Sequence, residues 1–356
     1  MLKYIGVMKK YIMASPATLL EGYFMTPRDE VLSALRGEAV GKVPASSVTQ
    51  VGIVQAMEQI GAVWPQAHYD PEKMARVGTA LYKMAGLKTA RIPFCLTVEA
   101  EAMGADINIG TIDKQPSIAR HPFAEADQVA IPPDFLYRGR IQSVLAATKL
   151  LKQNVKDLPV IVGTTGPFTL AGHLIGIEKY LLWTIKARDN VVKVLDVANK
   201  ACIEYTKAIL DAGADVVSIS DPSASPELMS PRDFASLVKP KLIELSNTIS
   251  TRHAVGVLHI CGMAQKIIKD MAATGFDALS IEEKVDIAAA KQMIGSKPTM
   301  VGNVSAARTL FSGTPDAVRE ETKRAIAAGI NVVAPGCGIA PRTPLANIQA
   351  LVSAAQ

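Results

Sequence analysis

The sequence is short of cysteine and of long apolar runs, and each shortage excludes a class of protein. Four cysteines, widely and irregularly spaced over 356 residues, cannot build a disulfide framework, so we expect reduced thiols and a cytoplasmic protein. No run approaches the roughly 18 consecutive apolar residues of a membrane helix. Lys9 and Lys10 interrupt the apolar N-terminus, which therefore lacks the continuous apolar core of a signal peptide.

A large excess of one charge sign is also missing. The chain has 38 Lys+Arg against 33 Asp+Glu, and neither a basic run nor interleaved basic and aromatic residues mark a nucleic-acid surface. A doubly wound sheet lacks its dinucleotide-binding signature, because Gly336-x-Gly338 continues to Pro341 where a third glycine would stand. What the chain does have is apolar content: 49% of its residues are hydrophobic, which is enough for a large core.

Helix starts and ends can be read along the whole chain. In four places a Ser, Thr or Asp stands directly before a proline, which predicts an N-cap side chain and a proline at the first helical position. These pairs are Thr26-Pro27, Asp70-Pro71, Ser230-Pro231 and Thr314-Pro315. Three glycines stop predicted helices shortly before β-rich runs. They are Gly213, Gly275 and Gly329.

Short β-rich runs alternate with these helices, and several are continuously apolar, as strands buried on both faces should be. They span residues 43–49, 89–94, 159–164, 215–220, 255–260, 277–281, 299–302 and 331–334. Eight strands alternating with helices predict an α/β fold, a (β/α)8 TIM barrel formed by residues 25–356. We interpret residues 95–137 as an insertion after the second strand that caps the barrel mouth. We interpret residues 1–24 as an N-terminal helical extension upstream of a natural start at Met25.

Three residues with metal-binding side chains end two of these runs. Residues 256–262 predict a strand that ends in His259-x-Cys261, and residues two apart on a strand project from the same face. Cys337 follows the last predicted strand between two glycines, which keep its sulfur accessible. One imidazole and two thiolates are the ligand set of an open catalytic zinc centre, which keeps a fourth position for water or substrate.

The barrel prediction supports this hypothesis, because active sites in this fold lie at the C-terminal ends of the strands. The three candidate ligands follow the predicted fifth and eighth strands. Asp221, Glu282 and Asn303 follow the fourth, sixth and seventh. Asp221 and Glu282 are candidates for a fourth zinc ligand or for a hydrogen bond to His259, and Asn303 is a candidate for cofactor binding. A turn cap at Asp221 and a solvated loop at Glu282 stay open as alternatives.

The remaining cysteines and histidines have simpler interpretations. Cys202 falls on the apolar stripe of a predicted helix and Cys95 follows a strand without a partner, so we expect both to be structural. Four histidines have no second ligand near them in sequence, and we expect them to be structural or solvent-facing. They are His68, His121, His173 and His253.

Three stretches of the chain resemble one known family. His259-x-Cys261 with Cys337 far downstream, residues 221–231 and residues 26–37 are similar to the uroporphyrinogen decarboxylase superfamily. The similarity extends from about residue 25 to the C-terminus, and the branch that it resembles most is the methylcobamide:coenzyme M methyltransferases of methanogenic archaea. The decarboxylases carry an arginine-rich segment near the first strand, and residues 43–51 contain no arginine. This difference counts against a decarboxylase.

The resemblance implies a (β/α)8 barrel enzyme that binds zinc through His259, Cys261 and Cys337. It implies methyl transfer from methylcobamide to the thiol of coenzyme M, 2-mercaptoethanesulfonate, held as a thiolate. We expect the methylated corrinoid on a partner protein, because no histidine lies in the Asp-x-His-x-x-Gly pattern of many corrinoid-binding modules. A cation should hold the sulfonate, and four candidates stay open: Arg252, Lys284, Arg308 and Arg342.

Two other classes of protein stay open. A metal-free lyase of the decarboxylase type would contain no zinc and would carry several cations in its pocket. A non-enzymatic, zinc-stabilised partner of a corrinoid protein would have a closed site with four protein ligands. Metal analysis combined with a thiol-binding assay separates the three.

Overall fold

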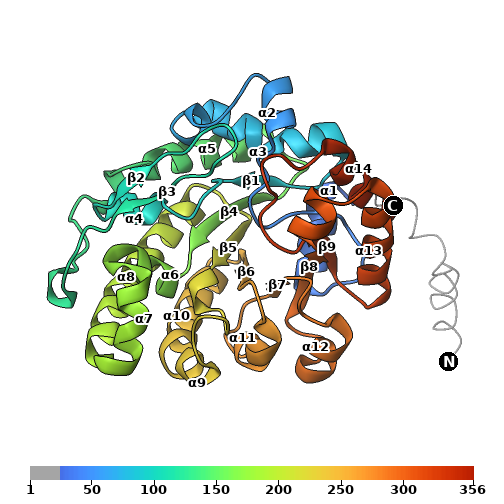
Figure 1. Ribbon diagram of the computed structural model, residues 1–356. Coiled ribbons are helices and arrows are strands. Elements are labelled where there is room, and N and C mark those ends of the chain that lie inside the picture. Colours follow the sequence, from blue (N-terminus) through green and yellow to red (C-terminus); the bar gives the residue numbers. More distant parts are fainter. Residues whose placement is uncertain (1–24) are drawn as a thin grey trace, which may run out of the picture.

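The computed structural model describes residues 25–356, so the interpretation of residues 1–24 as a helical extension lies outside the described residues. In this part of the chain, seven parallel strands form one curled sheet in the order β1-β4-β5-β6-β7-β8-β9, with helices around it (Figure 1). The strands are β1 Ala90–Ile92, β4 Val160–Thr165, β5 Val216–Ser220, β6 Val255–His259, β7 Ala278–Ile281, β8 Thr299–Val304 and β9 Val332–Pro335. They confirm the second to eighth predicted strands.

The first predicted strand, residues 43–49, is wrong as a regular strand. The segment makes a single parallel bridge, between Ala45 and Val333 of β9. On its other side the Lys88 amide donates to the Ala45 carbonyl at 2.9 Å, just before β1. Pro44 limits the pairing because proline has no backbone N–H to donate to a ladder. The segment still lies between β9 and β1 and closes the (β/α)8 TIM barrel at the eighth position.

Four helices begin where the sequence predicts, and each of the four expected N-cap side chains accepts a backbone N–H from its first turn. Among the described residues, no helix is both long and apolar enough to cross a membrane. The helices are α1 Pro27–Arg36, α2 Val54–Gln59, α3 Pro71–Ala85, α4 Val98–Ala102, α5 Ile141–Asn154, α6 Pro167–Ile175, α7 Ile177–Lys186, α8 Arg188–Asp211, α9 Pro231–Asp233, α10 Lys239–Ser250, α11 Ile268–Ala272, α12 Ile287–Ile294, α13 Pro315–Ala327 and α14 Leu345–Ala355.

The barrel interior is apolar at the N-terminal ends of the strands, where α1 closes it. Valine and alanine side chains from the strands pack there against Val31, Leu32 and Leu35 on the buried face of α1. These contacts close the N-terminal end of the barrel, which we call its floor. Burial of apolar surface there stabilises the fold by roughly 25 cal/mol for each Å² removed from water. The polar side chains that line the cavity, among them Arg91, His259 and Cys337, lie toward the opposite, C-terminal end.

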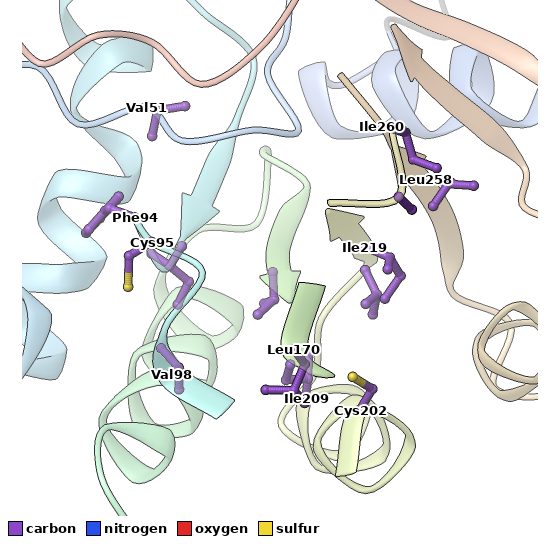
Figure 2. Close-up of a cluster of buried hydrophobic side chains, with 14 of the residues drawn as sticks. Val51, Phe94, Cys95, Val98, Leu170, Cys202, Ile209, Ile219, Leu258 and Ile260 are labelled. Carbon is purple, nitrogen blue, oxygen red and sulfur yellow. The ribbon is translucent and has the colours of Figure 1, made fainter. Parts of the chain in front are cut away.

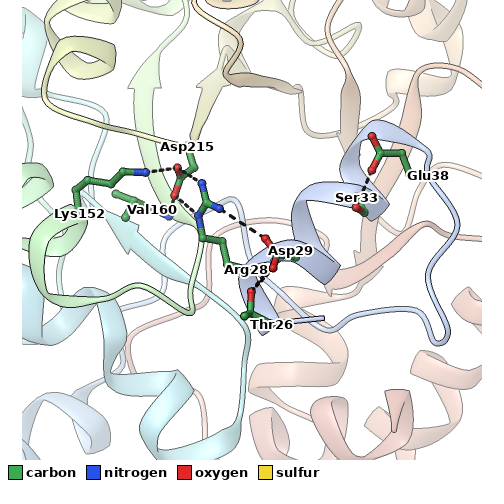
Figure 3. A network of polar contacts seen from close by, with 8 residues as sticks. All are labelled: Thr26, Arg28, Asp29, Ser33, Glu38, Lys152, Val160 and Asp215. Carbon is green, nitrogen blue, oxygen red and sulfur yellow. Dashed lines mark hydrogen bonds and ion pairs between the residues drawn. The ribbon is translucent and has the colours of Figure 1, made fainter. Parts of the chain in front are cut away.

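A carboxylate fixes α1 to this floor. Arg28 of α1 donates to both oxygens of Asp215, which directly precedes β5, at 2.8 and 3.2 Å. The same carboxylate accepts from Lys152 at 2.6 Å and from the Val160 amide at 3.0 Å (Figure 3). Two cations and a backbone amide thus surround one buried aspartate, which is a paired and fully hydrogen-bonded charge.

Residues 95–137 leave the barrel after β1 and reach over its mouth. They contain α4 and a two-stranded antiparallel sheet of β2, Asp106–Asn108, and β3, Ser117–Arg120. In the loop between these strands, Asp113 pairs with Arg342 at 2.7 Å, and Arg342 follows β9. Gln115 of the same loop lines the cavity at the barrel mouth. These contacts support the interpretation of the insertion as a cap.

Candidate active site

β6 ends at His259, and Cys261 lies two residues beyond the end of the strand. Figure 2 shows their neighbours Leu258 and Ile260 among the buried apolar side chains of the core that the helices share. Residues on either side of a given strand residue point to the opposite face. His259 and Cys261 nevertheless line the same cavity at the barrel mouth, so the His-x-Cys pair projects to one side although the regular strand has ended.

The His259 ring is buried and held by one neighbour. Its Nδ1 lies 3.1 Å from the Ser280 hydroxyl of β7, and the side chain is 3% exposed. Burial lowers the pKa of His259 to about 4, with a smaller contribution from the Arg91 cation, so the ring is neutral at neutral pH. A neutral imidazole with Nδ1 fixed by a hydroxyl presents Nε2 as its free donor atom.

The chain turns sharply after Cys261, and this turn requires glycine. Gly262 has a φ of 74°, and a Cβ at this position would lie 2.7 Å from the Ser225 hydroxyl. Its amide donates to a carboxylate oxygen of Glu282 at 2.6 Å. Burial, with smaller contributions from the nearby Cys337 and Glu282, raises the pKa of the Cys261 thiol to about 12, so the thiol is protonated at neutral pH.

Cys337 is positioned by the segment that closes the barrel. The Thr49 hydroxyl donates to the Cys337 carbonyl at 3.0 Å, and the Ile339 amide donates to the Gln50 carbonyl at 3.0 Å. Burial raises the pKa of the Cys337 thiol above its usual value. The irregular stretch that replaces the first strand therefore carries the loop of a candidate ligand.

His259, Cys261 and Cys337 line one cavity of about 130 Å³ at the C-terminal end of the barrel. A neutral imidazole and two thiols are the donor types that zinc prefers, so the residues present fit this metal. Within residues 25–356, however, no three His, Cys, Asp or Glu side chains are arranged as a metal site. The three donors are brought together by the cavity that they line.

Asp221 reaches the rim, as predicted, but contacts a helix and not the His259 ring. Its buried carboxylate accepts from the Thr169 amide and hydroxyl, both at 2.7 Å, and from the Phe168 amide at 3.2 Å, all at the start of α6. Its own amide donates to the His259 carbonyl at 3.0 Å. Burial raises the pKa of Asp221 to about 6, against the opposing effect of these hydrogen bonds.

Glu282 and Asn303 shape the loops at the rim. Glu282 accepts the Gly262 amide and so fixes the turn beside Cys261. The Asn303 amide donates to the carbonyls of Val285 and Glu282, at 3.0 and 3.4 Å, which holds the loop after β7. Asn303 is not among the residues that line the cavity, and its role in cofactor binding stays a prediction.

The structural interpretation of Cys202 is confirmed, and that of Cys95 is incomplete. Cys202 is fully buried on α8, and its thiol donates to the Thr165 carbonyl at 3.3 Å (Figure 2). Cys95 is also buried, but it lines the cavity, and Arg140 donates to its sulfur at 3.3 Å. The sequence analysis did not predict the contact of Cys95 with Arg140. Arg140 lies 45 positions along the chain, beyond the reach of any local pattern.

The four cations proposed for the sulfonate all form ion pairs elsewhere, and none lines the cavity. The pairs are Arg252 with Asp211, Lys284 with Glu227, Arg308 with Glu321 and Arg342 with Asp113. The cation that does line the cavity is Arg91 of β1, which the sequence analysis missed. The signal was an arginine inside a buried apolar strand, at a position that alternation turns inward.

A closed barrel that gathers an imidazole and two thiols at the C-terminal ends of its strands has the architecture of an enzyme of the (β/α)8 class. The chain belongs to the uroporphyrinogen decarboxylase family, whose profile matches residues 26–356. It is 47% identical over 332 residues to the methylcobamide:CoM methyltransferase MtaA of Methanosarcina barkeri, covering 92% of this chain and 97% of that protein. It is 35% identical over 333 residues to the methylcobamide:CoM methyltransferase MtbA of Methanosarcina mazei, covering 93% and 98%. A solved structure of a methyltransferase from Methanosarcina mazei matches with a TM-score of 0.89 at 46% identity, covering 93% of this chain and 98% of that one.

Proposed function

We propose that this chain is an enzyme of methanogenesis that transfers a methyl group from methylcobamide to the thiol of coenzyme M. The observation that carries the proposal is the single cavity at the barrel mouth that His259, Cys261 and Cys337 line together. Two relatives named methylcobamide:CoM methyltransferase, 47% and 35% identical to this chain, support it. In the reaction the methyl carbon leaves cobalt and bonds to sulfur, the bonding electrons stay on cobalt, and the thiol loses its proton.

His259, Cys261 and Cys337 would hold zinc in this cavity. When bound, zinc supplies a Lewis acid that lowers the pKa of a thiol substrate, so that its sulfur is a thiolate nucleophile at neutral pH. The neutral His259 ring carries a single proton. When this proton is on Nδ1, the Nε2 atom has a free lone pair and can bind a metal without losing a proton. Both cysteine thiols are protonated at neutral pH, so loading the site must release two protons and should tighten as pH rises.

The other residues of the rim act by positioning. Ser280 orients the His259 ring, and Glu282 fixes the turn that carries Cys261. Asp221 connects the His259 backbone to the start of α6. We assign Asp221 and Glu282 to positioning the donor set, since hydrogen-bond partners of metal ligands tune both affinity and reactivity.

The methylcobamide is expected on a partner corrinoid protein that docks at the barrel mouth. The names of two relatives, methylcobamide:CoM methyltransferase, support methylcobamide as the donor. All four cysteines are free, which supports a reducing compartment, the cytoplasm.

Metal content tests the donor set. We expect one zinc per chain in the wild type and in the control Cys202→Ala, whose sulfur is buried on α8 away from the cavity. Cys337→Ala, Cys261→Ala and His259→Ala should each lose most of the metal. Methyl transfer should fall by about 1000-fold or more in each, because zinc chemistry is worth several kcal/mol. Full zinc occupancy in Cys337→Ala would remove that cysteine from the site, and wild-type protein without zinc would favour the metal-free lyase.

Proton release tests the activation of the thiol. Mixing the zinc-loaded enzyme with 2-mercaptoethanesulfonate near neutral pH should release close to one proton per site, because the free thiol is mostly protonated there. The matched control is 2-hydroxyethanesulfonate, which should release none. Thiol binding without proton release would contradict the proposed mechanism, even if methyl transfer itself is observed.

A further inference from the structure

Arg91 is a buried cation with no carboxylate partner. Its side chain is 2% exposed, and no ion pair to it is found among residues 25–356. Burial lowers its pKa to about 10, so the guanidinium still carries its charge at neutral pH. An uncompensated charge inside a protein is costly, and such groups are almost always paired.

The other large buried arginine shows the usual solution. Arg140 is 1% exposed and lies 2.5 Å from a carboxylate oxygen of Glu101, while its remaining nitrogens donate to Thr97 and Cys95. Arg91, by contrast, donates from Nε to the Val48 carbonyl at 3.3 Å and from Nη1 to the Pro93 carbonyl. In the described part of the chain its Nη2 has no acceptor.

The barrel leaves room for this guanidinium. On the neighbouring strand β4, a Cβ added at Gly163 would lie 1.9 Å from Nη2 of Arg91. Any other residue at position 163 would therefore displace the guanidinium from its place. The glycine of this strand thus leaves the space that the guanidinium occupies inside the barrel.

The cavity brings the unpaired charge and the three candidate metal ligands together. Arg91, His259, Cys261 and Cys337 all line the same space of about 130 Å³. A space of this size admits a small molecule and excludes the side chains of a corrinoid. An anion that occupies it can contact the guanidinium at one end and the sulfur donors at the other.

We propose that Arg91 binds the anionic end of the thiol substrate, the sulfonate of coenzyme M, and so selects thiols that carry a nearby oxyanion. This inference rests on the proposed function for the identity of the thiol. A planar guanidinium can donate two parallel hydrogen bonds to an oxyanion, which a lone surface lysine cannot. The ligand supplies the counter-charge that the barrel lacks, while its thiol reaches the donor set.

The decisive experiment compares two methyl acceptors in Arg91→Gln. The kcat/KM for 2-mercaptoethanesulfonate should fall about 10- to 100-fold, the size of a lost charged hydrogen bond. The kcat/KM for the uncharged thiol 2-mercaptoethanol should stay within about two-fold of wild type. The control Arg252→Gln, which removes an exposed paired cation, should change neither. Equal losses for both thiols, or no loss for either, would overturn the proposal.

A second variant and a binding measurement test the same proposal independently of Arg91→Gln kinetics. If Arg91→Gln does not fold, Gly163→Ala displaces the guanidinium and should show the same selective loss, with Gly41→Ala, whose Cβ meets nothing within 4 Å, as its control. Calorimetry with ethanesulfonate needs no thiol, metal or methyl donor. Wild type should bind it and both cavity variants should not. If wild type binds ethanesulfonate but shows no methyl transfer, the proposed function is wrong and the anion site is still supported. If wild type and Arg91→Gln bind ethanesulfonate equally, the anion site is wrong.

Discussion

The two ends of β5 carry two buried aspartates in opposite electrostatic settings. At Asp215, before the strand, burial favours the neutral acid, but hydrogen bonds from Arg28 and Lys152 outweigh it and lower the pKa. At Asp221, after the strand, burial dominates and raises the pKa to about 6, although Thr169 and Phe168 donate to the carboxylate. The first is a carboxylate with two cations, and the second has no ion pair within residues 25–356.

The comparison shows that the charged groups at the N-terminal end of the barrel stabilise the fold, whereas those at the C-terminal end are available to a ligand. At the floor, every partner that Asp215 needs is supplied by the chain itself. At the mouth, the cation of Arg91 has no carboxylate and the thiols of Cys261 and Cys337 are held protonated. Groups left unsatisfied in this way are available to an incoming ion or substrate, which agrees with the location of active sites in this fold.

Breaking the floor should give the largest loss of stability. Asp215→Ala leaves Arg28 and Lys152 without their shared partner. We expect the free energy of unfolding to fall by about 3 kcal/mol, the lower end of the range for breaking a buried ion pair. The lower end applies because the two cations are 31% and 43% exposed. Denaturant unfolding measures the change. Asp211→Ala, which breaks the exposed pair with Arg252, should cost less than about 1 kcal/mol.

The pH dependence of this variant follows from the sign of the pKa shift. The Asp215 pKa is lower in the folded state, so its contribution is present above the unfolded-state value of about 3.9 and is lost as pH falls through the folded value. The gap in stability between wild type and Asp215→Ala should therefore be full at neutral pH and narrow in acid. A gap that is constant with pH would show that packing and not charge holds α1.

The mouth aspartate should show the opposite slope. The Asp221 pKa is raised to about 6 in the folded state, so the folded protein binds a proton more tightly than the unfolded chain does. Relative to Asp221→Asn, the wild type should lose about 3 kcal/mol of stability as pH rises from about 4 to about 7. Parallel unfolding curves at several pH values measure it. A slope of the same sign as that of Asp215 would break the comparison.

The smallest effect should come from the partner of His259. Ser280→Ala removes the hydroxyl that holds the imidazole and should weaken zinc binding about 10- to 100-fold, the usual effect of a partner of a metal ligand. Ser218→Ala is the matched control, because this serine is also fully buried on a barrel strand but makes no hydrogen bond among the described residues. Zinc competition with a chelator measures both. Equal effects would assign Ser280 to packing alone.

The sequence predicts features that depend on residues close together in the chain, and it misses contacts between residues that only the folded barrel brings together. Apolar runs and helix-stopping glycines are local signals, and seven of the eight predicted strands are confirmed. The spacing of His259 and Cys261 predicts, from the period of a strand, that both project to one side. The contact of Thr49 with Cys337 spans 288 positions, and the place of Arg91 beside Gly163 depends on the pairing of β1 with β4. No pattern along the chain contains such contacts.

The floor formed by α1 has a kinetic consequence. Val31, Leu32 and Leu35 fill the lower end of the barrel, so the cavity is reached from the rim. A large protein that delivers the methyl group would cover this entrance while it is docked. If the proposed function holds, the small acceptor would arrive before such a donor, and the methylated product would leave only after the donor departs. Steady-state kinetics should show a compulsory order of addition, with inhibition at high concentrations of the carrier protein.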